Sequence, residues 1–399
     1  ARHAPDPPPP RAPARPPPPP PPAPGAPPSP PPPPGRGGPH FSLLGSSRWP
    51  RPQVLAVPRR VGGVLGDTLG MPVPVPDPPF VVAEALRLGV TRKQLRSPRL
   101  HAPVRGVRMD AARRDDLRSV APAVQLALPR AAAFSHTTAA ALWDLPLPPG
   151  VSGLSPLHVS GPPGTRPLDA TGVLTHVGLP GRDVVVRHGL AVTGPDRTVA
   201  DLAALVAAGG HGLTEPDLVV VLDAVLGARG RARPHPRDRL ETRVHLLRGR
   251  RGVVPLASAL HRSRRFVDSP METLLRLRLV GSGFPCPVVG ADVVDDDGRW
   301  LARPDLCWPE LRIAVEYDGR HHLTSARQRL NDVARQEELE RLGWRVIVLF
   351  AYDVLGRWPS TEGRILQAFV DRGARPEELP DAPDPTTRPR VVTPAHRIT

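Results

Sequence analysis

The stretch at residues 303–322, RPDLCWPELRIAVEYDGRHH, decides the fold of the C-terminal half. A short apolar run follows Asp305, and the Pro309–Glu310 pair then provides turn residues. Leu311–Asp318 is rich in Ile, Val and Tyr, which is typical of a β-strand. The stretch therefore predicts a β-hairpin with acidic residues on both of its strands.

The predicted strand distributes its side chains between two faces. Because successive side chains alternate, one face carries Ala314, Glu316 and Asp318. The other face carries three apolar groups that we expect to point into the core: Ile313, Val315 and Tyr317. With a turn centred on the Pro–Glu pair, Asp305 lies opposite Ala314 and joins the face of the acids. We therefore expect three carboxylates to lie close together.

Such a group of carboxylates predicts a metal site. Neighbouring carboxylates repel one another, and a divalent cation among them keeps them ionised. Hard oxygen ligands favour Mg²⁺ or Mn²⁺ over zinc. An ion of this kind can polarise a phosphoryl oxygen and lower the pKa of a bound water. His322, four residues after Asp318, could activate that water or protonate the leaving oxygen.

The segment from Ser269 to about Val370 resembles the very-short-patch-repair-like (Vsr-like) endonuclease domain, a branch of the PD-(D/E)XK nuclease superfamily. The resemblance implies a restriction-endonuclease-like α/β sandwich that cleaves DNA. The segment covers about a quarter of the chain, and the resemblance rests on an ordered set of pieces within it: SPMETLLRLRLV at 269–280, RPDLCWPE at 303–310, VEYDG at 315–319 followed by His322, NDVARQEELERLGWRVI at 331–347, and Asp353.

The resemblance also assigns roles to individual acids. It implies that Asp305 and Glu316 are metal ligands and that Glu272, on the first helix of the domain, is an assisting acid. Asp318 occupies the position at which the superfamily usually has lysine. Without that lysine, the charge of the transition state must be stabilised by His322, by an arginine such as Arg335, or by a second cation.

Some of these residues also have plainer explanations. Ser269 and Glu272 match the N-cap and the third position of a helix capping box, so Glu272 could serve only to bind backbone donors. Asp318 precedes Gly319 and fits ordinary turn chemistry. His322 could be a surface histidine. If the domain is inert, the protein is a DNA-binding regulator rather than an enzyme.

The surroundings of the hairpin predict an α/β sandwich with a mixed sheet. The last strand is a near-continuous apolar run, which is typical of a strand buried on both sheet faces. The expected elements are a helix at 271–280, a strand at 288–294, a turn at 295–298, a strand at 300–306, a helix from Ser325 to about Gly343, a strand at 344–350 and a helix at 359–370.

A second unit precedes this domain. Residues 80–108 predict an amphipathic helix, a turn at Gly89, a second helix with Thr91 as N-cap, and a strand over VRGVRM at 104–109. The segment resembles the winged-helix-like N-terminal domain of AbiEi-type antitoxins. The resemblance implies DNA contacts from four residues on the second helix, unless these form an ordinary solvated face: Arg92, Lys93, Gln94 and Arg96.

Composition divides the chain further. The prolines, 59 in all, gather largely at the N-terminus, where a disordered arm or an SH3-type ligand is expected. In the α/β middle region, His136 has no evident partner and is expected to be structural.

The expected parts are a disordered arm at 1–79, a winged-helix-like unit at 80–135, an α/β region at 136–228, a basic helical linker at 229–265, the nuclease-like domain at 266–371 and a disordered tail at 372–399.

Net charge favours nucleic acid as the partner. The chain carries +15, and residues 229–265 hold 12 arginines against two acids. This block could track DNA phosphates beside the acidic site. An arginine-rich coding bias would explain the same excess, because Lys93 is the only lysine.

The sequence also argues against several classes of protein. No run of about 18 apolar residues predicts a transmembrane helix, and the N-terminus has no secretory signal, so a cytoplasmic location without membrane binding is expected. The only cysteines, Cys286 and Cys307, are too few for a zinc site by themselves and are expected to be buried thiols. We expect a metal-dependent DNA endonuclease without a small-molecule cofactor, with an antitoxin-type regulator or a protein-interaction scaffold as alternatives.

Overall fold

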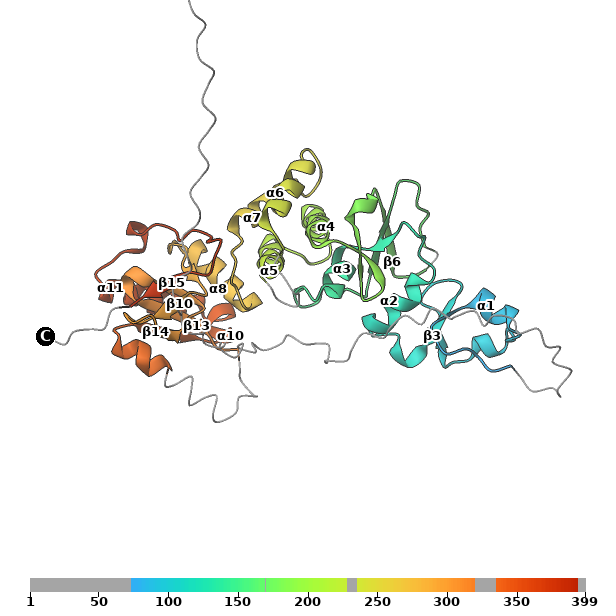
Figure 1. Cartoon of the computed structure of the whole chain (residues 1–399), viewed down its shortest axis with the longest axis horizontal. Coiled ribbons are helices and arrows are strands. Elements are labelled where there is room, and N and C mark those ends of the chain that lie inside the picture. Colours follow the sequence, from blue (N-terminus) through green and yellow to red (C-terminus); the bar gives the residue numbers. More distant parts are fainter. Residues whose placement is uncertain (1–72, 169, 228–234, 320–334, 394–399) are drawn as a thin grey trace, which may run out of the picture. The chain divides into compact units, whose positions relative to one another are not determined.

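Residues 73–168, 170–227, 235–319 and 335–393 are described by a computed structural model (Figure 1). Residues 1–72 of the predicted disordered arm lie outside the described residues, and so does His322. The described chain is a mixed α/β protein, as the sequence predicts. Within these residues no helix combines the length and apolar character needed to span a membrane.

The N-terminal part contains a small antiparallel sheet. Its strands are β1 (Phe80–Val81), β2 (Leu100–His101) and β3 (Val107–Asp110), in the order β1-β3-β2. Helix α1 (Val82–Arg87) is present, but the predicted second helix is only a 3₁₀ turn, η1 (Gln94–Arg96). The N-cap of this turn is Lys93 and not Thr91 as predicted, although the hydroxyl of Thr91 accepts from the N–H of Gln94 at 3.3 Å. The segment then continues through the short 3₁₀ turn η2 (Ala111–Arg113) and α2 (Leu117–Gln125).

The middle region is built on a mixed five-stranded sheet in the order β6-β5-β4-β8-β7. Strands β5 and β6 are parallel, as are β4 and β8, whereas β4–β5 and β7–β8 are antiparallel. Helix α3 starts directly after β4, and its contacts with both β5 and α4 place it between the sheet and α4. The elements are β4 (Ala133–Phe134), α3 (His136–Leu142), β5 (Leu157–Gly161), β6 (Val173–Val177), η3 (Gly181–Asp183), β7 (Val184–Arg187), β8 (Leu190–Thr193) and α4 (Pro195–Ala207).

Three further helices pack on α4: α5 (Glu215–Leu226), α6 (Arg237–Leu246) and α7 (Val253–Arg262). Leu240 and Leu256 are fully buried in the apolar cluster that these helices share. Gly252, at φ +90°, starts α7 so close to α4 that a Cβ would lie 2.6 Å from the backbone N of Ala204. The prediction of a linker at 229–265 is therefore wrong for its described part, which belongs to a helical core.

The C-terminal part contains a mixed four-stranded sheet in the order β14-β13-β12-β9. Helices α8, α10 and α11 cover one face, and residues 335–341, also helical, cover the other together with β10 and β11. The predicted faces are confirmed, because Ile313 and Val315 lie in one apolar cluster and Ala314 in the other. The elements are α8 (Pro270–Gly281), β9 (Val288–Val289), β10 (Asp292–Val294), β11 (Trp300–Ala302), β12 (Leu306–Trp308), η4 (Pro309–Leu311), β13 (Ile313–Tyr317), β14 (Arg345–Leu349), α10 (Ala351–Leu355) and α11 (Trp358–Asp371).

Two predicted strands differ from the observed ones. The strand expected at 288–294 is broken at Gly290 into β9 and β10, which belong to different sheets. Gly290 has φ +53°, and a Cβ there would lie 2.6 Å from a backbone oxygen, so glycine is required at the break. The strand expected to be buried on both faces, β14, lies at the edge of the described sheet and leaves Val346 and Val348 half-exposed.

The segment after α11 is part of the fold. It forms η5 (Pro376–Glu378) and β15 (Arg390–Val392), and β15 pairs in parallel with β10. Thr393 is buried and its hydroxyl accepts from the indole N–H of Trp344 at 3.1 Å. The predicted loose tail is therefore wrong for residues 372–393. Cys286 and Cys307 are buried free thiols, as predicted.

Candidate functional site

The register of the β12–β13 hairpin sets the positions of the predicted metal ligands. Cys307, not Asp305, pairs with Ala314, so the predicted register is wrong by two residues. The turn is longer than a simple Pro–Glu corner, because η4 forms a 3₁₀ turn that moves the centre one residue along the chain. One further step in the observed register places Asp305 opposite Glu316, and directly opposed residues share a face.

The carboxylate of Asp305 is held by the neighbouring strand. One of its oxygens accepts from the backbone N–H of Tyr317 at 2.8 Å, and its backbone oxygen accepts from Gly290 at 2.9 Å. Asp305 and Glu316 are both half-buried, so each lies at the boundary between the apolar core and solvent. The two predicted ligands therefore share one face at the end of the sheet.

The other predicted acids take different positions. The carboxylate of Glu272, which is 6% exposed, accepts from the N–H of Asp268 at 2.8 Å, while Ser269 caps the N–H of Glu272. Ser269 is the N-cap as predicted, whereas Glu272 binds the backbone donor of Asp268, one residue before the donor that a capping box uses. Asp318 follows β13 and donates its backbone N–H to Leu349 at 2.8 Å.

The prediction that the three hairpin acids Asp305, Glu316 and Asp318 form one close group of carboxylates is wrong. Over the described residues, no three carboxylates have ligand oxygens that all lie within 4.8 Å of one another. A magnesium ion does not require such a cage, because it usually keeps several waters and binds one or two carboxylates together with substrate phosphates. The pair formed by Asp305 and Glu316 is compatible with that type of binding.

Three of the residues predicted to contact DNA lie on the surface. Arg92, Lys93 and Arg96 are exposed around η1. The side chain of Gln94 is less able to contact DNA, because its amide donates to the backbone oxygen of Val73 at 2.8 Å and its side-chain oxygen accepts from Thr91. Arg335 is half-buried at the start of the described helix 335–341.

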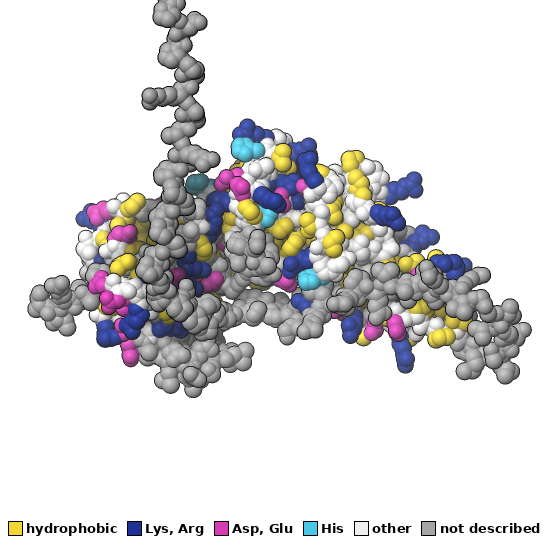
Figure 2. All heavy atoms as spheres, in the orientation of Figure 1, with side chains coloured by type: hydrophobic (Ala, Val, Ile, Leu, Met, Phe, Trp, Pro, Cys, Tyr) yellow, Lys and Arg dark blue, Asp and Glu magenta, His cyan; other side chains and the backbone are white. Residues whose placement is uncertain are grey.

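Much of the basic block at 229–265 serves the fold instead of a DNA surface. Arg243 is buried and binds both carboxylate oxygens of Asp183, at 2.8 and 2.9 Å. Arg237 and Arg265 both bind Asp384. Arginine side chains do remain on the surface around α6 (Figure 2). Among the described residues of this block, the exposed arginines are Arg239, Arg248, Arg250 and Arg251.

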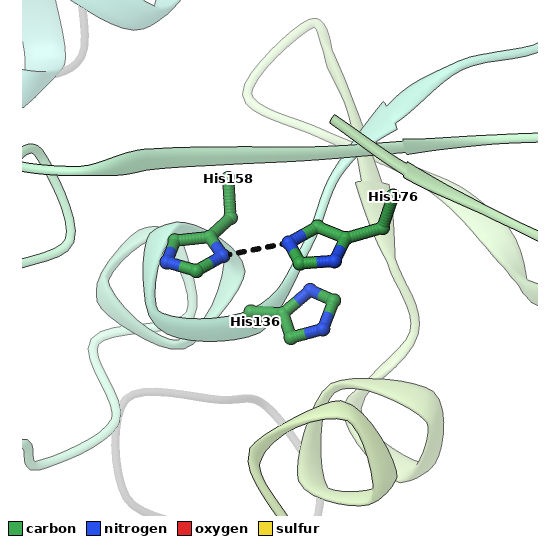
Figure 3. Close-up of side chains that lie close together, drawn as sticks. All are labelled: His136, His158 and His176. Atoms are coloured by element: carbon green, nitrogen blue, oxygen red, sulfur yellow. Dashed lines mark hydrogen bonds between the residues drawn. The ribbon is translucent and has the colours of Figure 1, made fainter. Parts of the chain in front are cut away.

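A cluster of three histidines lies in the middle region. His136 is the first residue of α3, His158 lies on β5 and His176 on β6. A ligand nitrogen from each lies within 4.8 Å of the other two. The Nδ1 of His158 is 2.9 Å from the Nε2 of His176, and the ring of His136 stacks on that of His176 with centroids 3.8 Å apart (Figure 3).

Strand pairing brings the three rings together. In the parallel β5–β6 pair, His176 lies opposite Ser160, which is two residues after His158 and therefore on the same face. Ser135 donates its N–H to the backbone oxygen of His158, and this places His136, the next residue, beside the pair. Ser160 donates its hydroxyl to that of Ser135, which lies 2.9 Å from the Nδ1 of His136.

The three imidazoles are neutral at neutral pH. Burial, followed by repulsion from His176 and His158, lowers the pKa of His136 to about 2. Burial and the neighbouring histidines lower the pKa of His158 to about 3, and burial also lowers the pKa of His176. The neutral form is the one that binds metal ions.

The sequence did not reveal this cluster. The sequence gives His136 no evident partner and favours a structural role, and the structure supplies the partner, because its ring stacks on that of His176. The three histidines belong to separate elements and show no short metal-binding spacing, since the contact depends on the pairing of β5 with β6. The one local signal is a histidine inside an apolar strand, where a polar group needs a partner.

Comparisons with known proteins give no function. No family model matches the chain, and no solved structure matches it. It is similar to two curated proteins of Mycobacterium tuberculosis, the uncharacterized protein MT2308 of strain CDC 1551 / Oshkosh and the uncharacterized protein Rv2248 of strain H37Rv. Each is 29% identical over 210 residues, which is 53% of this chain and 72% of the relative.

Proposed function

We propose that the protein is a divalent-metal-dependent endodeoxyribonuclease that hydrolyses phosphodiester bonds in DNA in the cytoplasm. The observation that supports this proposal is the hairpin register: its last pair is Leu306 with Val315, and the next residues on the two strands are the half-buried Asp305 and Glu316. Mg²⁺ or Mn²⁺ is the expected ion, because both ligands are carboxylates.

The chain's own residues would bind and orient the ion. The N–H of Tyr317 fixes one oxygen of Asp305, so the other can be directed at a cation shared with Glu316. When bound, the ion would polarise the phosphate and lower the pKa of the attacking water. His322 and Arg335 remain the proposed sources of the proton and the positive charge that the missing lysine would supply.

Exposed arginines would hold the DNA. Arg92, Lys93 and Arg96 form one basic group around η1, and the four exposed arginines around α6 form another. Contacts between such residues and phosphates position DNA without reading its sequence. Gln94 contributes less than the sequence predicts, because its side chain is bound to the protein backbone.

A cleavage assay tests the proposal. The full chain is incubated with plasmid, single-stranded and mismatch-bearing DNA, with Mg²⁺, with Mn²⁺, or with chelator. We expect cleavage only with metal, and its loss in Asp305→Asn and in Glu316→Gln, while Glu310→Gln, an exposed acid on the same hairpin, cleaves normally. Absence of cleavage in all conditions, or cleavage by both ligand variants, overturns the proposal.

A DNA-binding regulator of antitoxin type, with an inert nuclease-like domain, is the second candidate. It is favoured by Asp318 at the usual lysine position and by the absence of a three-carboxylate cage in the described residues. Arg92→Ala combined with Arg96→Ala should weaken DNA binding and reduce its salt slope by about 2. The exposed Arg182→Ala serves as control. Salt-dependent DNA binding by a protein that cleaves nothing would favour the regulator.

A further inference from the structure

We propose that His136, His158 and His176 bind one divalent transition-metal ion, with zinc as the expected ion. This site is separate from the carboxylate pair of the hairpin, and neither its residues nor its metal is needed for the proposed nuclease. Imidazole nitrogens suit zinc, copper and nickel, whereas magnesium prefers oxygen. The middle region would thus hold a metal that differs from the one at the hairpin.

The spacing of the nitrogens fits a shared ion. Two nitrogens that each lie about 2.05 Å from one ion, at angles of roughly 90–110°, are about 2.9–3.4 Å apart. The Nδ1 of His158 and the Nε2 of His176 are 2.9 Å apart and share a hydrogen bond, which a bound ion would replace. The third ligand nitrogen, from His136, lies within 4.8 Å of both.

The protein holds the ligands in place from outside the cluster. The hydroxyl of Ser135 contacts the Nδ1 of His136 at 2.9 Å and receives a hydrogen bond from Ser160. Contacts of this kind fix the ring orientation and the tautomer of a metal ligand. His136 also adopts φ +51°, a left-handed conformation that is strained for a non-glycine residue and is often found at functional sites.

Polar atoms without partners lie at the cluster and at the adjoining pocket. The Nε2 of His158 and the hydroxyl of Thr137 are buried and have no hydrogen-bond partner. Thr137 and His211 line a pocket of about 360 Å³, and the ring of His211 lies 5.3 Å from that of His158. Three protein ligands beside a pocket leave a coordination position for water or a small anion, as in catalytic rather than structural zinc sites.

The charges around the cluster can accommodate a dication. Arg197 is the cation that repels protons from both His136 and His176. Its guanidinium binds Asp201 at 2.7 Å and Asp183 at 3.3 Å, so these two carboxylates offset its charge. The uncharged imidazoles themselves add no repulsion toward a metal ion.

Metal titration of the full chain tests this inference. The chain is stripped with chelator, returned to buffer with excess Mg²⁺ to fill any oxygen site, and titrated with Zn²⁺ by calorimetry; Co²⁺ absorption reports the ligand set. We expect one Zn²⁺ per chain. Loss of a direct ligand in His158→Ala, His176→Ala or His176→Gln should weaken binding by at least about 100-fold, since outer contacts alone contribute about 10–100-fold.

Controls separate this site from other sites and from misfolding. His245→Ala, at an exposed position on α6, and the pair Asp305→Asn with Glu316→Gln should bind zinc as the wild type does. Circular dichroism identifies a variant that fails to fold. The number of Zn²⁺ ions bound by the wild type is measured without any variant, so it tests the inference even if a variant misfolds. Absence of zinc binding by the wild type, unchanged binding in all histidine variants, or loss of binding in the hairpin variants would each overturn the inference.

Discussion

Ser135 links a hydrogen-bond network to the proposed metal site. Its hydroxyl contacts His136 and accepts from Ser160, and all three residues are buried. Ser135→Ala leaves the three imidazoles in place but removes the group that orients one of them. We expect zinc affinity to fall by about 10–100-fold in a calorimetric titration. Ser119→Ala on α2 is the control, and equal affinity in the two variants would contradict a positioning role for Ser135.

The sequence predicts the place of some candidate site residues better than that of others. Asp305 and Glu316 were found because strand alternation is a local property that three or four residues reveal. His136 was not, because its contacts with His158 and His176 depend on strand pairing between distant segments. Gln94 shows a third case, since it lies on the predicted turn but its amide binds Val73, far from it in sequence.

Helix α4 carries a carboxylate that should make stability depend on pH. Burial raises the pKa of Asp201 to about 6, although Arg197 opposes the shift. Because the folded-state pKa exceeds the unfolded value of 3.8, this group favours folding most below pH about 3.8, and that contribution is lost as the pH rises through about 6. Asp201→Asn should therefore gain stability relative to the wild type between pH 4 and pH 7.

Urea unfolding of both proteins at the two pH values measures this difference. Every other titrating group is common to the wild type and the Asn variant, so its contribution cancels in the comparison. The attraction of Arg197 acts on the ionised carboxylate, so its loss matters at pH 7; because the pKa of about 6 already includes this attraction, the sign of the change stays the same. An equal difference in the free energy of unfolding at pH 4 and pH 7 would show that Asp201 does not titrate abnormally.

The sequence predicted the helices of the C-terminal part better than the register and the exposure of its strands. Helix α8 and helix α11 occur within one residue of their predicted bounds, because each has a clear apolar period and a proline near its start. The hairpin register was missed because the 3₁₀ turn η4 adds length that no turn motif in the sequence indicates. The exposure of β14 was missed because its apolar run does not tell an edge strand from a central one.

A buried ion pair joins the helical core of the middle region to the first helix of the C-terminal part. Asp223 on α5 binds Arg276 on α8 at 2.6 Å, and both are about 1% exposed. Asp223→Ala leaves Arg276 buried without its partner, which should cost about 3–5 kcal/mol of unfolding free energy in a urea titration. Asp238→Ala, an exposed acid, should have little effect. A loss as small as the control's would mean that water replaces the lost carboxylate.

The C-terminal segment contacts several parts of the described chain, and its removal should therefore lower stability well beyond its own length. A chain ending at Asp371 loses the pairing of β15 with β10, the hydrogen bond between Trp344 and Thr393, and the carboxylate of Asp384 that binds Arg237 and Arg265. We expect the melting temperature, followed by calorimetry, to fall by at least about 2–4 °C, and Asp384→Ala to account for part of the loss. Over the described residues β15 pairs with β10 alone, whereas the three histidines lie on α3, β5 and β6, so zinc stoichiometry should stay the same. Unchanged melting after truncation would contradict the role of this segment as part of the fold.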